Sequence, residues 1–67
     1  MKIKGGIFVY AQDIMKIKDV SLRTAVREIR LIRDVFDKEG KDITIFDVSK
    51  YWDVELEDLI SILNEIR

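Results

Sequence analysis

The sequence predicts a mostly α-helical domain made of two consecutive helix-turn-helix units, about four helices in all, with a short two-stranded β element. Three observations lead to this fold class. The 67-residue chain contains no Pro and only three Gly, so it has few places at which a helix must stop. Apolar residues recur every three or four positions along two long stretches, as on the buried face of a helix. The third observation is an internal repeat.

The repeat has a period of 34 residues and aligns positions 13–33 with positions 47–67. Seven of these 21 aligned pairs are identical: Asp13/Asp47, Lys16/Lys50, Asp19/Asp53, Val20/Val54, Leu22/Leu56, Ile32/Ile66 and Arg33/Arg67. Each half of the chain therefore predicts the same supersecondary unit, although any two helix-turn-helix segments share part of such a pattern. The two units, about 7–37 and 43–67, form a single domain over residues 1–67, because so short a chain has no room for a second core.

The first unit begins with a β-prone stretch near residues 7–10, followed by a short helix at 11–17 and a tight turn. Ser21 is a good N-cap for the longer helix at 22–37, because its side-chain oxygen can accept a hydrogen bond from a backbone N–H of the first turn. Gly40 is predicted to stop this helix. The buried stripe of the helix is predicted to consist of Leu22, Ala25, Val26, Ile29, Ile32, Val35 and Phe36.

The second unit repeats this order, with a β-prone stretch at 43–45, a short helix at 46–52 and a longer helix at 55–66. Glu55 stands where the first unit has its serine cap, and Glu is a poor N-cap. We therefore expect Asp53 to cap the last helix instead.

Two arrangements are open for the β-prone stretches. If a pseudo-two-fold axis relates the units, the stretches at 7–10 and 43–45 can pair as a small antiparallel ribbon. Alternatively, the Gly-Gly dipeptide at 5–6 turns a hairpin between residues 2–4 and 7–9.

The residue types present limit the chemistry of the chain. It has no Cys and no His, which excludes disulfides and thiolate zinc sites and removes the commonest acid–base group. It also lacks a Gly-rich phosphate loop and a Ser or Lys beside an activating partner. We therefore expect no enzyme activity, no cofactor and no metal ion. Because no apolar run reaches membrane-spanning length and nothing resembles a signal peptide, we expect no membrane partner and a cytoplasmic location.

Charges of opposite sign are segregated along the chain, although the net charge is only −1. Residues 1–34 contain eight Lys or Arg and four Asp or Glu, a net charge of +4. Residues 35–67 contain four Lys or Arg and nine Asp or Glu, a net charge of −5. The central helix carries a dense positive row, made of Arg23, Arg27, Arg30 and Arg33. Arg forms strong phosphate contacts and paired bonds to guanine, so this row indicates a nucleic-acid-binding helix, while a solvated helix face is the simpler interpretation.

These segments resemble the helix-turn-helix superfamily. VSLRT at 20–24, preceded by DIMKI at 13–17, resembles the helix-turn-helix of regulators of the mercury-resistance (MerR) type and of phage excisionases. The second unit resembles the lactose-repressor type, through Asp47, Val48, Tyr51, Val54, Leu59, Ile62 and Asn64. Both matches depart from the family pattern, because Asp19 and Asp53 stand where the turn usually has Gly.

The resemblance implies a small bacterial DNA-binding protein, either a transcription regulator or an accessory factor of a mobile element, with double-stranded DNA as its partner. It also implies that Leu22, Arg23 and Arg27 contact base edges while Ser21 and Thr24 hold phosphate. Together with the basic residues around them, the predicted nucleic-acid-binding set is Ser21, Leu22, Arg23, Thr24, Arg27, Arg30, Arg33, Lys16 and Lys18. A domain of about 60 residues buries only about 60% of its unfolded surface and is marginally stable by itself. We therefore expect copies of the chain to associate as a homo-oligomer.

An alternative interpretation is a protein–protein interaction module. The last helix keeps the apolar skeleton of the central helix but has Glu57 at the Arg23 position and Asp58 at the Thr24 position, so DNA phosphates would repel it. This acidic C-terminal unit would then bind a partner, or copies of the chain would stack head to tail through their opposite charges. The candidate interface residues are Leu31, Tyr51 and Trp52. For Tyr51 and Trp52, at the end of a short helix, a role in a thin core is the favoured interpretation, whereas Leu31 lies off the buried stripe and is the better interface candidate.

Overall fold

The computed structural model of this protein describes residues 2–38 and 40–67 and confirms the predicted fold class. Within these residues the elements are, in order, β1 (Phe8–Val9), α1 (Ala11–Lys18), α2 (Leu22–Val35), β2 (Ile43–Thr44), α3 (Ile45–Trp52) and α4 (Leu56–Ile66). The pairs α1–α2 and α3–α4 are the two helix-turn-helix units. No helix in the described part of the chain is long and apolar enough to cross a membrane.

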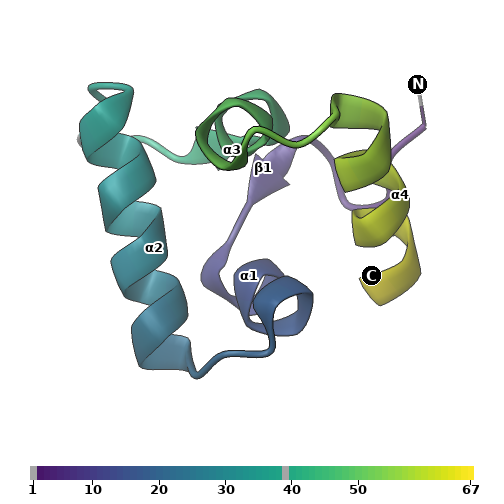
Figure 1. The fold of residues 1–67 in the computed structure, drawn as a ribbon, viewed down its shortest axis with the longest axis horizontal. Helices are drawn as coiled ribbons and strands as arrows, with labels where there is room; N and C mark the ends of the chain where they lie inside the picture. The colour runs from purple at the N-terminus through teal and green to yellow at the C-terminus, as the bar shows by residue number, and fades with distance from the viewer. Residues whose placement is uncertain (1, 39) are drawn as a thin grey trace.

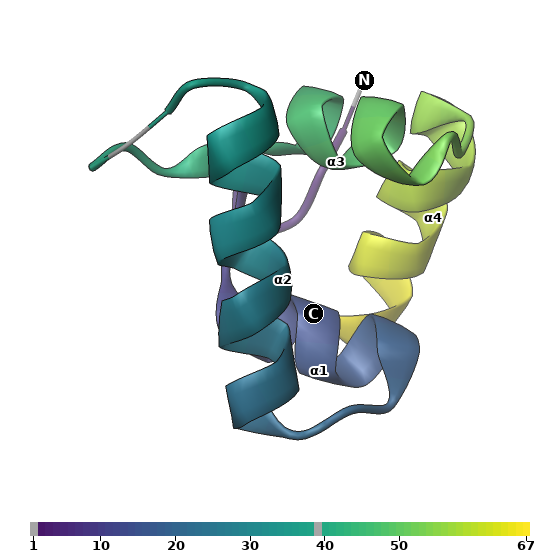
Figure 2. The same ribbon diagram turned by 60° about the vertical axis from the view of Figure 1, so that its left-hand side comes forward.

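The two units are arranged around an approximate two-fold axis (Figure 1). Strand β1 pairs antiparallel with β2, with Val9 opposite Ile43 and Phe8 opposite Thr44. Val9 and Ile43 are one repeat length apart, so the ribbon joins equivalent positions of the two units, as a two-fold axis requires. Helices α2 and α4 consequently lie on opposite sides of the molecule, and the turned view in Figure 2 shows the same separation.

The alternative hairpin around Gly5 and Gly6 is not formed. Both glycines have positive φ, 76° and 84°, and turn the chain so that the segment before them lies beside α4. Each strand of the ribbon also has a side chain bonded to its outer edge. Arg67 Nη2 donates to the Phe8 carbonyl at 2.8 Å, and Asp47 Oδ2 accepts the Thr44 N–H at 2.8 Å. These bonds occupy groups that would otherwise be free to pair with the strand of another chain.

Each short helix begins with the same carboxylate bond. Asp13 Oδ2 accepts the backbone N–H of Tyr10 at 3.0 Å, and Asp47 Oδ2 accepts the equivalent N–H of Thr44 at 2.8 Å. Both carboxylates stand at the third helical position and satisfy the N–H of the N-cap residue, as in a capping box. This shared role explains why the repeat keeps an aspartate at both positions.

Both capping carboxylates are buried, and each is paired with a basic side chain. Arg67 donates to Asp13 through Nε and Nη2 at 3.1 and 2.9 Å, and Lys38 Nζ donates to Asp47 at 2.6 Å. Burial raises the pKa of Asp13, but the bonds from Arg67 and from the capped N–H outweigh this effect and hold that pKa below its usual value. The pKa of Asp47 is likewise lowered, because Lys38 and the capped residue outweigh burial.

The turn inside each unit contains an aspartate in the left-handed region. Asp19 has a φ of 53° and Asp53 has a φ of 55°, at the positions where the resembling families have Gly. Asp is among the few residues that enter this region readily. Asp53 therefore ends α3, and the prediction that it caps α4 is wrong. Glu55 occupies that N-cap position and makes no side-chain hydrogen bond to the helix.

Helix α2 ends at Val35, two residues before the predicted end. Asp37 has a φ of 53°, in the left-handed region. The Lys38 N–H donates to the Arg33 carbonyl at 2.9 Å and the Asp37 N–H donates to the Asp34 carbonyl at 3.3 Å, which are the two hydrogen bonds of a Schellman motif. The prediction that Gly40 stops this helix is therefore wrong, because the left-handed residue at its end is an aspartate and Gly40 follows later.

One apolar cluster joins the two units. Its buried members are Val9, Ile14, Ala25, Ile29, Ile32, Ile43, Ile45, Val48, Leu59, Ile60 and Leu63. On α2 the buried positions are only the central part of the predicted stripe. Leu22 and Val35 are 56% and 61% exposed, contrary to the prediction, and they are the first and last residues of the helix.

Candidate nucleic-acid interface

The first turn of α2 is capped and open to solvent. Ser21 Oγ accepts the Thr24 backbone N–H at 3.3 Å, which confirms Ser21 as the N-cap. The Ser21 hydroxyl also donates to Thr24 Oγ1 at 3.2 Å, so in the described structure the Thr24 hydroxyl keeps its own proton for another acceptor. Leu22 and Arg23 between them are also exposed. A ligand can therefore reach the positive end of this helix together with its first side chains.

Three arginines form a continuous basic stripe along the outer side of α2, and we use this name for Arg23, Arg27 and Arg30. All three are exposed, and none is in an ion pair within residues 2–38 and 40–67. Like charges three or four residues apart on a helix destabilise it by about 0.2–0.5 kcal/mol per pair. The charges of the stripe therefore do not stabilise the helix.

Arg33 does not belong to this stripe. Three residues advance an α-helix by about 300°, so successive steps of three turn the side chains away from the line by about 60° each. Arg33 is accordingly half-buried, and its Nη2 lies 3.9 Å from Asp42 Oδ1. Its Nε is buried and has no hydrogen-bond partner in the described part of the chain. The predicted row of four arginines is thus a stripe of three plus one arginine directed toward the β2 side.

A shallow depression of about 520 Å³ lies within the basic stripe. Its apolar lining comes from Leu22 and Val26, and its polar lining comes from the three arginines. The predicted buried stripe includes Val26, but this residue is half-buried and borders the depression. The angular position of Val26, beside Arg30 rather than at the centre of the apolar face, is the signal that could have placed it here.

The two predicted lysines lie elsewhere. Lys16 Nζ donates to the Ile66 carbonyl at 3.4 Å, at the C-terminal end of α4. Lys18 Nζ lies 3.3 Å from Glu28 Oε1 and 5.6 Å from the centre of the Trp52 ring. Because both lysines are occupied within the fold, the structure does not join them to the basic stripe.

The three candidate interface residues differ in their surroundings. Leu31 is 45% exposed on α2. Tyr51 and Trp52 are half-buried and pack against the core. The Trp52 Nε1–H donates to Glu28 Oε1 at 2.8 Å, which fixes the end of α3 to the middle of α2. The core interpretation therefore applies to both aromatic residues, and Leu31 alone remains a surface candidate.

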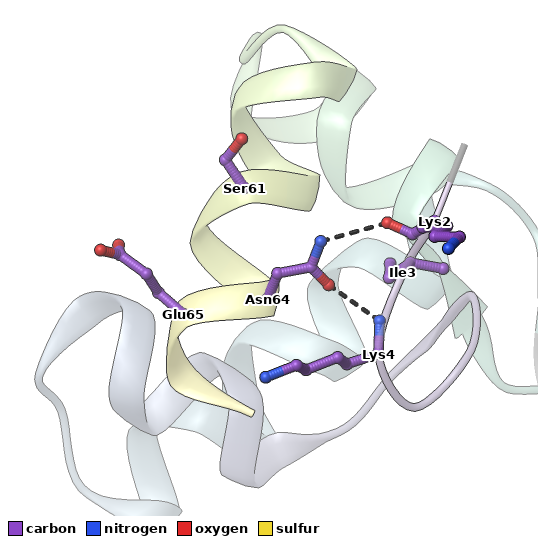
Figure 3. Close-up of a pocket in the computed structure, with 6 residues that line it drawn as sticks. All are labelled: Lys2, Ile3, Lys4, Ser61, Asn64 and Glu65. Carbon is purple, nitrogen blue, oxygen red and sulfur yellow. Dashed lines mark hydrogen bonds between the residues drawn. The ribbon is translucent and has the colours of Figure 1, made fainter.

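Another hollow, of about 1050 Å³, lies between α4 and the N-terminal segment (Figure 3). Asn64 of α4 fastens the N-terminal segment there, donating to the Lys2 carbonyl at 3.1 Å and accepting the Lys4 N–H at 2.8 Å. In Figure 3 Ser61 and Glu65 point away from this segment. The Asn64 amide is bonded to the N-terminal segment, so the hollow is a trough between these two docked segments.

Comparison of this chain with protein-family models, with curated proteins and with solved structures gives no match.

Proposed function

We propose that this protein binds double-stranded DNA by placing α2 in the major groove. The observation that carries the proposal is the basic stripe, which begins at the exposed first turn of the second helix in a helix-turn-helix unit. Second helices of such units enter the major groove with their N-terminal residues toward the bases. The sequence resemblance of residues 13–24 to mercury-resistance regulators and excisionases supports the same orientation.

Each exposed group on this helix has a suitable DNA partner. Arg23 and Arg27 can donate paired hydrogen bonds to the O6 and N7 atoms of guanine. Leu22, which is 56% exposed, can contact the methyl group of a thymine. Thr24 has a free hydroxyl proton for a phosphate oxygen, whereas the Ser21 hydroxyl is already used within the cap.

Only the first unit is suited to this contact. Helix α4 has no equivalent arginines and carries acidic side chains on the opposite side of the molecule (Figure 1). On random-sequence DNA, where binding is non-specific, the three arginines of one copy can all contact phosphates. About three phosphates are then neutralised, which predicts weak, strongly salt-dependent binding with a slope of log K against log salt near −3. We propose that a homodimer presents two such helices to two half-sites, in a transcription regulator or a mobile-element accessory factor.

The test is a titration of random-sequence duplex DNA at two salt concentrations with wild type and Arg23→Glu/Arg27→Glu. The matched control is Lys41→Glu/Lys50→Glu, which changes the net charge equally at two exposed lysines outside α2. We expect the arginine variant to lose at least tenfold in affinity and to flatten the salt slope by about two, while the lysine control changes far less.

Two results would contradict the proposal at different levels. If wild type shows no binding at low salt, the protein is not a DNA-binding protein of this kind. If wild type binds and both variants weaken equally, the DNA contact is not centred on α2.

A further inference from the structure

Exposed, unpaired charges of opposite sign lie on opposite sides of this molecule. The start of α4 carries three exposed acids, Glu55, Glu57 and Asp58, which we call the acidic turn. None of them is in an ion pair within the described residues, and neither are the arginines of the basic stripe. Figure 1 shows α2 and α4 on opposite sides of the fold, Figure 2 shows them separated as well, and no ion pair of the described residues joins the two surfaces.

The two charged surfaces occupy equivalent positions of the repeat. Glu57 is the counterpart of Arg23, and Asp58 is the counterpart of Thr24. The dipole of α4 favours acids in its first turn. That effect accounts for Glu57 and Asp58 within one molecule. It does not account for the basic stripe, whose positive charges have no acidic partner among the described residues. Helix α2, with the same backbone role, has a serine cap and no acid in its first turn.

We propose that the basic stripe of one copy binds the acidic turn of a second copy, so that copies associate head to tail. The stripe's arginines pair with Glu55, Glu57 and Asp58 of the neighbour. A second copy fits as the occupant because the complementary surface is part of the same chain. The net charge of −1 also imposes little general repulsion between copies.

This association has a defined geometry. Because the two surfaces differ and lie on opposite sides, a copy bound through its acidic turn still presents its own basic stripe. The contact is therefore heterologous, and assembly continues as an open chain or closes into a ring rather than stopping at a dimer. The inference does not rest on DNA binding, although DNA and the second copy would use the same arginines and so exclude each other.

Sedimentation equilibrium without nucleic acid tests the proposal, using paired charge reversals. Arg23→Glu/Arg27→Glu leaves both surfaces acidic, and Glu57→Arg/Asp58→Arg leaves both surfaces basic, so neither variant should associate with itself. An equal mixture of the two should associate, and the quadruple variant should associate like wild type. Wild-type association should weaken with added salt, because salt screens exposed charges. Circular dichroism confirms that each variant is folded.

Wild type that remains monomeric at millimolar concentration and low salt would overturn the proposal. Failure of the folded variants to associate when mixed would also overturn it, because the reversed charges are then complementary. If the Arg substitutions in the first turn of α4 prevent folding, Glu57→Gln/Asp58→Gln replaces that arm. It should lower the self-association of the folded chain, and unchanged association would then count against the inference.

Discussion

Arg67 makes the densest set of side-chain bonds in the described structure. Its Nε and Nη2 donate to Asp13, its Nη1 donates to the carbonyls of Lys4 and Gly6, and its Nη2 also donates to the Phe8 carbonyl. Only the planar guanidinium offers five donors in a fixed array, so Lys cannot reproduce this arrangement. Its repeat counterpart Arg33 has a single distant acid, which shows that the same residue type has diverged in role between the units.

Replacing Arg67 with Ala should destabilise the protein severely. Asp13, with a side chain only 10% exposed, would keep a buried charge without its partner, which costs about 3–5 kcal/mol. Domains of this kind are stable by only about 5–15 kcal/mol. Urea denaturation followed by circular dichroism measures the loss. Arg67→Lys should lose less than Arg67→Ala.

The matched control is Arg30→Ala, which removes an exposed arginine and should change the free energy of unfolding by no more than about 0.5 kcal/mol. Equal unfolding midpoints for the Arg67 and Arg30 variants would show that the bonds of Arg67 do not stabilise the fold.

At the scale of elements, the two helix-turn-helix turns have nearly the same backbone shape, with φ angles of 53° and 55° at Asp19 and Asp53. The resemblance to families with Gly at this position anticipated a special turn residue. It could not show that aspartate adopts the same conformation. The repeat fixed which positions are turns, while the assignment of Asp53 as a cap failed because capping and left-handed turns favour the same residue types.

Substitution of Asp53 should separate backbone strain from side-chain effects, because its side chain is exposed. Asp53→Gly should leave stability unchanged or raise it by up to about 1 kcal/mol, since Gly adopts positive φ without strain. Asp53→Val should lower it by about 1–2 kcal/mol. As a control, Asp58→Gly within α4 should be destabilising, by about 0.5–1 kcal/mol. Thermal denaturation distinguishes these outcomes, and a harmless Asp53→Val would contradict the turn geometry.

The candidate site was only partly predictable at this scale. Helical spacing correctly placed Arg23, Arg27 and Arg30 on one exposed side of α2. It failed for Arg33, because three-residue steps rotate around the helix, and the acid near it comes from the following loop. Lys16 and Lys18 lie close to this helix in sequence, but their bonds are to α4 and to Glu28 of α2. Contacts outside the basic stripe decided these outcomes, and only for Lys16 does the contact come from a distant part of the chain.

At the scale of the whole molecule, two buried carboxylate pairs tie the repeat units together. Asp13 of α1 is bonded to Arg67, which follows α4, and Asp47 of α3 is bonded to Lys38, which follows α2. Each pair therefore joins a short helix of one unit to the end of a long helix of the other. Their ionisation is coupled to assembly of the whole fold.

Stability should consequently fall in acid. Both aspartates have a folded-state pKa below the unfolded value of about 3.9, so their contribution is complete above that value and is lost as the pH falls through the lower folded pKa. We expect the free energy of unfolding to be nearly constant from about pH 7 to 5 and to fall below about pH 4. Urea denaturation across this range measures the change.

Asp47→Asn is the informative variant for this pH dependence. It can still accept the Thr44 N–H, and Lys38 is exposed enough to be hydrated, with 30% of its side chain accessible. Its stability should vary less with pH than that of wild type. An identical acid dependence in both proteins would mean that Asp47 does not contribute to it.

The sequence by itself determined the helix-turn-helix units, the Ser21 cap and the uneven charge of the two halves, because these depend on local spacing and composition. Tertiary structure alone decided that the two β-prone stretches pair, with Val9 opposite Ile43, and that α2 and α4 lie on opposite sides of the molecule. These features depend on how residues far apart in the chain meet, which a local pattern does not encode. The sequence determines that the two halves carry opposite charge, and the two-fold arrangement of the units determines that these charges lie on opposite sides of the molecule.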